Sequence, residues 1–307
     1  MSEKTPFHPE LARMARLLPR GLASGRWLRF LRILTAVPTR PPRGVKVLER
    51  ELPGTTATVR ILRPDGVGSE APVLLWMHGG GYVVGRAAQD DGYCGGLAKR
   101  LGMVVVSVEY RLAPEHPWPA ALDDCMAAFD LIHREPESLG VDPGRVVIGG
   151  RSAGGGLAAS LVLRIMDSER PLPLLQLLVY PMLDDRTLEG PVDQRPMRLW
   201  DESSNRFGWS AYLGCEPGSP VVMAEMVPAR REDFRGAPPT WIGVGSCDLF
   251  LEENRDYAGR LSETGVDVTL EVVPGAFHGF EAAVPWAEVS RRFIDAQVHA
   301  IEEALKS

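Results

Sequence analysis

The sequence predicts an α/β fold in which helices cover both faces of a mostly parallel β-sheet. Two observations lead to this prediction. From Val45 onward, short β-rich runs alternate with longer stretches of helical periodicity, and the later runs are apolar almost throughout. Strands buried on both faces of a sheet have this continuous apolar character, and parallel strands need a long crossover between them. The chain is also long enough to bury one large core.

Eight strands and five helices are expected in chain order. The strands are the β-rich runs Lys46–Glu51, Thr56–Leu62, Val73–Met77, Val104–Val108, Val146–Ile148, Leu174–Val179, Thr240–Val244 and Val268–Val273. The helices are the periodic stretches Asp91–Leu101, Ala120–Arg134, Gly155–Asp167, Asn254–Thr264 and Pro285–Leu305. Because no helix separates the first two strands, we expect them to form an antiparallel hairpin at one edge of the sheet.

The N-terminal segment is strongly basic, since residues 1–46 hold ten Lys or Arg and two Asp or Glu. Arginines alternate there with large apolar residues, which suits an amphipathic helix. The residues concerned are Arg26, Leu28, Arg29, Phe30, Leu31, Arg32, Ile33 and Leu34. The favoured interpretation is a helix packed on the body of the protein with its arginines in solvent. Weak contact with a membrane surface is the alternative.

A long segment over residues 184–238 does not fit the alternation of strands and helices. It holds no convincing strand, yet Trp200, Phe207, Trp209 and Tyr212 recur at spacings that suit helices. Segments of this length without strands in a compact domain are often functional lids. Together with the N-terminal segment, this insertion is expected to cover one edge of the sheet.

The overall composition excludes several other classes of protein. Of the 307 residues, 45% are hydrophobic and 24% are charged, as in ordinary soluble globular proteins. The formal net charge of −6 argues against a nucleic-acid-binding protein, which would carry an excess of basic residues. No run reaches the roughly 18 apolar residues of a membrane-spanning helix, and arginines interrupt the N-terminal residues, unlike in a signal peptide.

The four cysteines favour a reducing compartment. Cys94, Cys125, Cys215 and Cys247 are scattered, without metal-ligand or CxxC spacing. Without an export signal, free thiols in the cytoplasm are expected rather than disulfides. We therefore expect a cytoplasmic protein that uses no metal ion.

The strongest local motif is the segment Gly150-Arg151-Ser152-Ala153-Gly154. It lies between an expected strand and an expected helix, where a G-x-S-x-G nucleophile elbow lifts its serine above a sheet. Glycines are needed because larger side chains would collide in so tight a turn. The overlapping segment Gly154-Gly155-Gly156-Leu157-Ala158-Ala159 matches a loose dinucleotide pattern, but it lies in mid-chain rather than in a first β–α–β unit.

A serine nucleophile needs a base that accepts its proton. In strand–turn–helix elbows of this kind the chain order is serine, acid, histidine, and only His278 and His299 follow Ser152. His299 falls inside the expected final helix, which predicts a surface or packing role. His278 lies in a glycine-rich loop just after a strand. We therefore predict His278 as the base.

The base must in turn be oriented by an acidic residue from an earlier loop at a strand end. Asp248 follows the expected strand Thr240–Val244 most closely and precedes His278. Glu252 and Glu253 are the alternatives nearby. Asp248 is the predicted acid because it lies closest to the strand end.

Acyl transfer also requires hydrogen-bond donors aimed at the tetrahedral oxyanion. The segment His78-Gly79-Gly80-Gly81 follows an expected strand, and consecutive glycines let backbone N–H groups turn toward a substrate without obstruction. The N–H of Ala153, directly after the predicted nucleophile, would complete the oxyanion hole.

Several blocks together resemble the bacterial hormone-sensitive-lipase-like esterases. They are His78-Gly79-Gly80-Gly81-Tyr82, the run from Tyr110-Arg111-Leu112-Ala113-Pro114-Glu115 to Ala121, the Ser-Ala-Gly-Gly elbow, Asp248 with Glu252, and His278-Gly279-Phe280. The resemblance extends from about Val45 to the C-terminus. It implies an α/β-hydrolase catalytic domain over residues 45–307, with a helical cap made of N-terminal cap helices over residues 1–44 and the insertion 184–238.

Carried over residue by residue, the resemblance implies the roles of the site residues. Ser152 is the nucleophile, Asp248 the acid and His278 the base, while Gly80 and Gly81 join Ala153 as the oxyanion hole. His78 and Glu115 are implied to orient their loops without touching the substrate, and no cofactor is implied.

Two positions depart from the family pattern. Arg151 stands before the nucleophile, where Asp, Glu or Thr is usual, and Glu109 stands where Asp is usual. Arg151 would either favour an acidic substrate or pair with a nearby carboxylate, and pairing is the favoured interpretation.

The sequence therefore predicts a serine carboxylesterase that hydrolyses short- to medium-chain acyl esters through an acyl-enzyme intermediate. Lactone, amide or deacetylase chemistry is the alternative within the enzymes, because the same triad serves all of them. A binding protein on the same fold is the alternative outside them. Receptors that resemble this family have lost the histidine, whereas His278 is present here.

Overall fold

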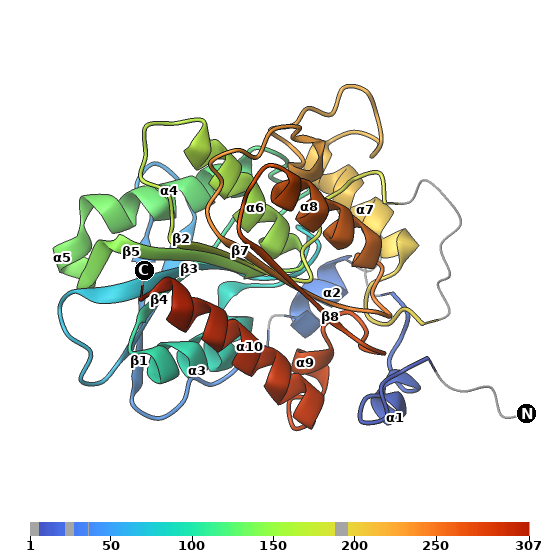
Figure 1. Ribbon diagram of the computed structural model, residues 1–307, viewed down its shortest axis with the longest axis horizontal. Coiled ribbons are helices and arrows are strands. Elements are labelled where there is room, and N and C mark those ends of the chain that lie inside the picture. Colours follow the sequence, from blue (N-terminus) through green and yellow to red (C-terminus); the bar gives the residue numbers. More distant parts are fainter. Residues whose placement is uncertain (1–5, 22–27, 36, 188–195, 307) are drawn as a thin grey trace, which may run out of the picture.

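The structure is a computed structural model that describes residues 6–21, 28–35, 37–187 and 196–306. Its centre is one eight-stranded sheet with the order β1-β2-β4-β3-β5-β6-β7-β8 (Figure 1). The strands are β1 (Val45–Glu51), β2 (Thr58–Pro64), β3 (Ala71–Met77), β4 (Val104–Glu109), β5 (Val141–Arg151), β6 (Leu175–Val179), β7 (Thr240–Gly245) and β8 (Val268–Val273).

The pairing of the strands confirms the predicted fold class. β1 pairs with β2, and β2 with β4, in antiparallel fashion, so the expected hairpin lies at the edge of the sheet. All other neighbours, from β4 and β3 to β7 and β8, are parallel. Parallel strands bring their carboxyl ends to one edge, so the loops after β3, β5, β7 and β8 meet there.

Helices form a layer on each face of the sheet (Figure 1). One layer holds α3 (Asp91–Leu101), α9 (Phe280–Ala283) and α10 (Glu288–Ala304), and the other holds α4 (Ala120–Arg134), α6 (Ala153–Met166) and α8 (Leu251–Glu263), with the short α5 (Pro136–Leu139) after α4. Each layer has its own apolar core, and alternate residues of β3 serve them: Leu75 and Met77 enter one core, Leu74 and Trp76 the other. This alternation explains why the strand is apolar at every position.

The helix after the elbow begins earlier than the sequence predicts. It was expected from Gly155, but α6 starts at Ala153 and includes the three consecutive glycines. A Cβ atom on Gly154 would lie 2.2 Å from the carbonyl oxygen of Met77, and one on Gly156 would lie 2.2 Å from that of Met182. The glycines therefore allow the helix to pack against the loops at the strand ends, and they do not mark a break in it.

The N-terminal segment and the insertion are largely helical where they are described. The N-terminal segment forms α1 (Ala12–Ala15) and α2 (Leu28–Thr35), and the insertion contains α7 (Glu202–Leu213) and a turn of 3₁₀ helix, η3 (Pro228–Arg230). No strand occurs in the described parts of the insertion, residues 184–187 and 196–238. The two segments contact each other, since Leu199 N donates a hydrogen bond of 2.9 Å to the carbonyl oxygen of Pro19.

The expectation that the arginines of the N-terminal helix lie in solvent is wrong for Arg32. This half-buried side chain donates to the carbonyl oxygens of Val83 and Ala113, both at 2.8 Å, and to the carboxylate of Glu115 at 2.7–2.8 Å. The hydrogen bond from Arg32 lowers the pKa of Glu115 to about 2. Arg26 and the side chain of Leu34 lie outside the described residues.

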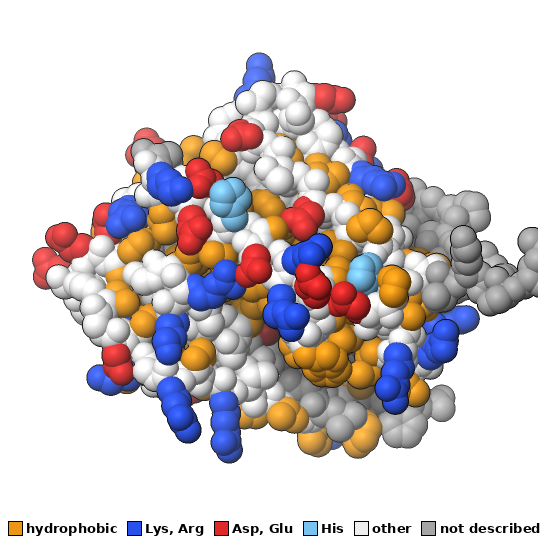
Figure 2. Space-filling view, turned by 60° about the horizontal axis from the view of Figure 1, so that its bottom comes forward, with side chains coloured by type: hydrophobic (Ala, Val, Ile, Leu, Met, Phe, Trp, Pro, Cys, Tyr) orange, Lys and Arg blue, Asp and Glu red, His pale blue; other side chains and the backbone are white. Residues whose placement is uncertain are grey.

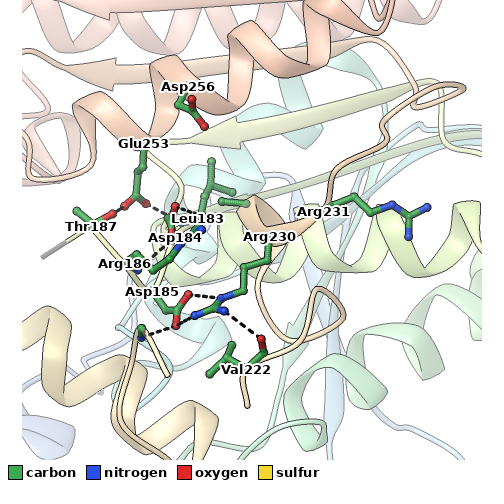
Figure 3. Close-up of polar contacts among 12 residues, drawn as sticks. Leu183, Asp184, Asp185, Arg186, Thr187, Val222, Arg230, Arg231, Glu253 and Asp256 are labelled. Carbon is green, nitrogen blue, oxygen red and sulfur yellow. Dashed lines mark hydrogen bonds and ion pairs between the residues drawn. The ribbon is translucent and has the colours of Figure 1, made fainter. Parts of the chain in front are cut away.

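Buried polar contacts hold the beginning and the end of the insertion together (Figure 3). Arg230 donates to both carboxylate oxygens of Asp185, at 2.8 and 2.7 Å, and to the carbonyl oxygen of Val222 at 3.0 Å. Glu253 of α8 accepts a 2.7 Å hydrogen bond from Leu183 N and another from Thr187, and burial raises its pKa well above the usual range. The insertion is therefore anchored to the helix that follows Asp248.

Among the described helices, none combines the length and the apolar character that a bilayer crossing requires.

Candidate active site

Ser152 lies at the sharp turn between β5 and α6. Its backbone has φ +55° and ψ −124°, a conformation that costs a non-glycine residue about 1–3 kcal/mol. The flanking glycines make the turn possible, because a Cβ atom on Gly150 would lie 2.3 Å from the carbonyl oxygen of Gly154. The structure thus has the strand–turn–helix geometry that the motif predicts.

His278 and Asp248 lie next to Ser152, as the chain order predicts. His278 Nε2 is 2.9 Å from Ser152 Oγ, and His278 Nδ1 is 2.8 Å from Asp248 Oδ2. The second oxygen of Asp248 accepts a 3.0 Å hydrogen bond from Phe250 N. All three side chains are buried. The arrangement allows the serine hydroxyl to donate to Nε2 while the Nδ1 proton is held by the carboxylate.

The alternatives considered for the base and the acid point elsewhere. His299 is exposed on α10, 3.9 Å from Glu303. Glu252 is exposed and paired with Arg255, and Glu253 faces the insertion. Among the described residues, the side-chain hydrogen bonds of His278 are with Ser152 and Asp248, not with any of these three.

The glycine loop after β3, Gly79–Gly81, lies beside Ser152 and contains backbone N–H groups that have no hydrogen-bond partner among the described residues. Gly80 and Gly81 have φ +137° and +58°, both in the region that favours glycine. A Cβ atom on Gly81 would lie 2.0 Å from the ring of Trp200. Within the described part of the chain, the N–H groups of Gly80, Gly81 and Ala153 donate no hydrogen bond. Three open donors therefore lie beside the nucleophile, at the loop and at the N-terminus of α6.

The buried ring of His78 contacts the backbone of this loop and helps to fix its conformation. The ring is fully buried, stacks on Tyr110 at 4.2 Å between centroids, and has Nδ1 2.9 Å from the carbonyl oxygen of Gly79. Burial lowers the pKa of His78, which favours a neutral ring. Nearby, Glu109 accepts a 2.9 Å hydrogen bond from Ala87 N. These contacts orient loops, as the resemblance implies for His78.

Arg151 is paired with carboxylates, as the favoured interpretation of the sequence predicts. Its guanidinium lies between Asp90, 3.5 Å from Nε, and Glu281, 3.7 Å from Nη1, and it stacks over Tyr93 at 4.4 Å. Burial opposes the charge of Arg151, but Asp90, Tyr180 and Glu281 outweigh it and raise its pKa. The positive charge beside the nucleophile is therefore compensated within the protein.

Asp90, Tyr180 and Glu281 were not found by sequence reasoning. Tyr180 donates to Glu281 and lies edge-on to His278 at 4.7 Å, so this group joins the elbow to the histidine loop. The unusual cation at position 151 did indicate that an acidic partner was needed. Nothing in the sequence distinguishes Asp90 and Glu281 from the other acidic residues, because both come close only through the fold.

Arg151→Met is expected to lower the free energy of unfolding by about 3–5 kcal/mol, because it leaves two buried acidic side chains without their cation. Urea denaturation of the variant and the wild type measures this loss. Arg206→Met is the matched control, since the ion pair of Arg206 with Glu216 is exposed and worth at most about 1 kcal/mol. Equal, small losses in the two variants would contradict the pairing argument.

A cavity of about 430 Å³ opens above Ser152 and His278. Its wall is mostly apolar and comes from three parts of the chain: Leu18 and Leu31 of the N-terminal segment, Leu199 and Trp200 of the insertion, and Val84. A second cavity of the same volume lies between β8 and α10 and contains none of the predicted site residues. Among the described residues, no cluster of three or more His, Cys, Asp or Glu could hold a metal ion.

Fold and site together define an α/β hydrolase, and the comparisons with known proteins agree. Residues 74–282 match a family described as having the alpha/beta hydrolase fold. The chain belongs to this family, and the resemblance to the hormone-sensitive-lipase-like esterases is confirmed.

Individual relatives place the chain among the carboxylic ester hydrolases. It is 34% identical to esterase LipI of Mycobacterium tuberculosis, over 81% of this chain and 79% of that protein. It is also 34% identical to an ethyl acetate hydrolase of Pseudomonas putida, over 74% and 72%. Among solved structures, a bacterial heroin esterase superposes with a TM-score of 0.90 at 36% identity and covers 98% of this chain and 99% of its own.

Proposed function

We propose that this protein is a serine carboxylesterase that hydrolyses neutral esters of short- to medium-chain acids, with Ser152, His278 and Asp248 as its catalytic triad. The observation that carries the proposal is the continuous chain of contacts from Ser152 Oγ through His278 to Asp248 at the base of an apolar cavity. The four unpaired cysteines support a reducing compartment, and the cytoplasm is the proposed location.

The proposed reaction follows from this geometry. Ser152 Oγ attacks the ester carbonyl carbon while its proton moves to His278 Nε2, and Asp248 stabilises the resulting imidazolium. The N–H groups of Gly80, Gly81 and Ala153 stabilise the oxyanion. The tetrahedral intermediate collapses when the alcohol leaves with the proton from Nε2, which produces an acyl-enzyme. Water then attacks the acyl carbon with His278 as base, and the acid is released.

The cavity wall supports the proposed division of the chain into a catalytic domain, residues 45–307, and a cap made of residues 1–44 and the insertion 184–238. Leu18, Leu31 and Trp200 come from these two segments and close the cavity above the nucleophile. An apolar wall of this kind suits an acyl chain. The two acidic partners of Arg151 support a neutral substrate, since an acidic one would meet uncompensated negative charge.

The test is a panel of p-nitrophenyl esters of increasing chain length, together with a lactone and an amide, hydrolysed by the wild type and by Leu31→Ala. We expect ester hydrolysis with a preference for about four to eight carbons. Leu31→Ala is expected to raise KM for the longer esters about tenfold with little change in kcat, because the lost contact holds substrate and transition state alike. Acetate esters, which have the shortest acyl chain of the panel, serve as the internal control.

Faster turnover of the lactone or the amide than of any ester would overturn the proposed substrate class. Absence of hydrolysis across the whole panel would favour a binding protein. An unchanged chain-length profile in Leu31→Ala would contradict the proposed cap.

A further inference from the structure

Helix α2 carries apolar residues on two faces, and one of these faces is largely exposed to solvent. Leu28 is buried and Leu31 lines the cavity above Ser152. Phe30 and Ile33 lie one turn apart on the outer face, where 55% and 72% of their surface is exposed. An exposed apolar stripe on a helix is costly in water and commonly marks an interaction surface.

The exposed stripe lies on the helix that contributes Leu31 to the wall of the cavity. Leu18 and Leu31 both line the cavity, and their chain neighbours Leu17 and Phe30 are exposed. Val37, just beyond α2, is exposed as well. We call Leu17, Phe30, Ile33 and Val37 the entrance surface. Figure 2 shows one face of the molecule, on which hydrophobic side chains and Lys and Arg side chains are both exposed.

The segment of the chain that carries the entrance surface is rich in arginine, and six of its arginines lack an acidic partner among the described residues. The exposed cations of this part of the chain are Arg13, Arg16, Arg20, Arg29, Arg40 and Arg43, and none of them forms an ion pair with a described residue. In the described residues 6–43 the only acidic side chain is Glu10, which accepts hydrogen bonds from the backbone of Glu288 and Val289. Positive charge therefore predominates in this segment, although Asp201 lies beside Gly21 and Glu115 pairs with Arg32, and although the protein as a whole is acidic.

We propose that the entrance surface docks on an anionic lipid bilayer and so holds the N-terminal segment, which supplies Leu18 and Leu31 to the cavity wall, against the membrane. Exposed apolar side chains enter the boundary between headgroups and acyl chains, while the arginines pair with anionic headgroups. The acidic remainder of the protein is repelled by the same surface, so the charge distribution also orients the molecule. A second copy of this chain is a poorer occupant, because its entrance surface carries the same positive charge.

The experiment measures co-sedimentation of the full-length protein with two kinds of vesicle, phosphatidylcholine alone and about equal amounts of phosphatidylcholine and phosphatidylglycerol. We expect binding only to the mixed vesicles, weakening as salt is added. Arg16→Gln with Arg20→Gln is expected to lower the partition coefficient by about 20-fold or more, since each arginine near an anionic surface contributes about fivefold. Phe30→Ser with Ile33→Ser is expected to lower it about tenfold. This measurement does not involve ester hydrolysis, so its outcome is independent of the proposed function.

Leu48→Ser is the matched control, because Leu48 is equally exposed but lies on the edge strand β1. It is expected to bind vesicles as the wild type does, and urea denaturation verifies that all variants are folded. The proposal is overturned if the wild type does not bind the mixed vesicles, or if Leu48→Ser weakens binding as much as the α2 variant. Sedimentation of the wild type as a dimer that Phe30→Ser with Ile33→Ser dissociates would assign the surface to a second copy instead.

Discussion

Replacement of Ser152 by alanine is expected to lower kcat by about 10⁴-fold or more, and so is replacement of His278 by alanine, because members of a triad act as a unit. Without Oγ there is no atom to form the acyl-enzyme, and without the imidazole nothing takes the proton of Ser152 Oγ, which lies 2.9 Å from Nε2. Initial rates on p-nitrophenyl butyrate measure the loss. Mass spectrometry after treatment with an organophosphonate should locate the adduct on Ser152 in the wild type.

The acid is tested by a pair of isosteric variants. Asp248→Asn is expected to cost somewhat less than His278→Ala, because it disturbs the orientation of the imidazole without removing the base. Glu252→Gln is the matched control, since Glu252 is exposed and paired with Arg255. A greater loss in Glu252→Gln than in Asp248→Asn would move the acid role, and an adduct on another serine would refute the elbow assignment.

Gly81→Ala is expected to lower kcat by about 10²–10³-fold, the cost of losing one oxyanion donor. Gly81 has φ +58°, and an added Cβ atom would lie 2.0 Å from the ring of Trp200. The loop or the Trp200 ring must therefore move, and together with the strained φ this is expected to turn the N–H groups of the loop away from the position of the oxyanion. Because the loss falls on the transition state, kcat and kcat/KM should decrease together while KM stays nearly constant.

Gly96→Ala is the control for this loop variant. Gly96 lies in α3 with no atom within 4 Å of an added Cβ. Activity should be unchanged there, and stability should rise by about 0.5–1 kcal/mol. Retention of the phosphonate adduct by Gly81→Ala would show that the variant is folded and that Ser152 is still nucleophilic. Near-wild-type kcat in Gly81→Ala would remove Gly81 from the oxyanion hole.

Much of the architecture could be predicted because a strand that is buried on both faces has a recognisable local sequence, apolar at every position. A run such as Val73–Met77 is apolar at every position only when each face of its strand meets a core, as β3 does. The nucleophile elbow could be recognised in the sequence as well, because so tight a turn leaves no room for side chains and therefore requires glycine at fixed positions. The chain order of serine, acid and histidine then selected Asp248 and His278, which the structure brings together.

Other features depend on contacts between distant parts of the chain. The periodicity of α2 shows that the helix has different faces but does not show which of them turns inward. The structure turns Arg32 inward, because Glu115 and the carbonyl groups of Val83 and Ala113 offer it partners, and leaves Phe30 and Ile33 outside. Solvent exposure is thus decided by the surface on which a helix packs.

The sequence by itself determined the order of strands and helices, the elbow and the residues that follow each strand end, since these depend on local sterics and on patterns of burial along the chain. Only the tertiary structure decided that Arg151 lies between Asp90 and Glu281. A buried charge requires a partner of opposite charge. Which residue becomes that partner depends on which loops the fold brings within a few ångströms, and no single segment of the sequence determines that distance.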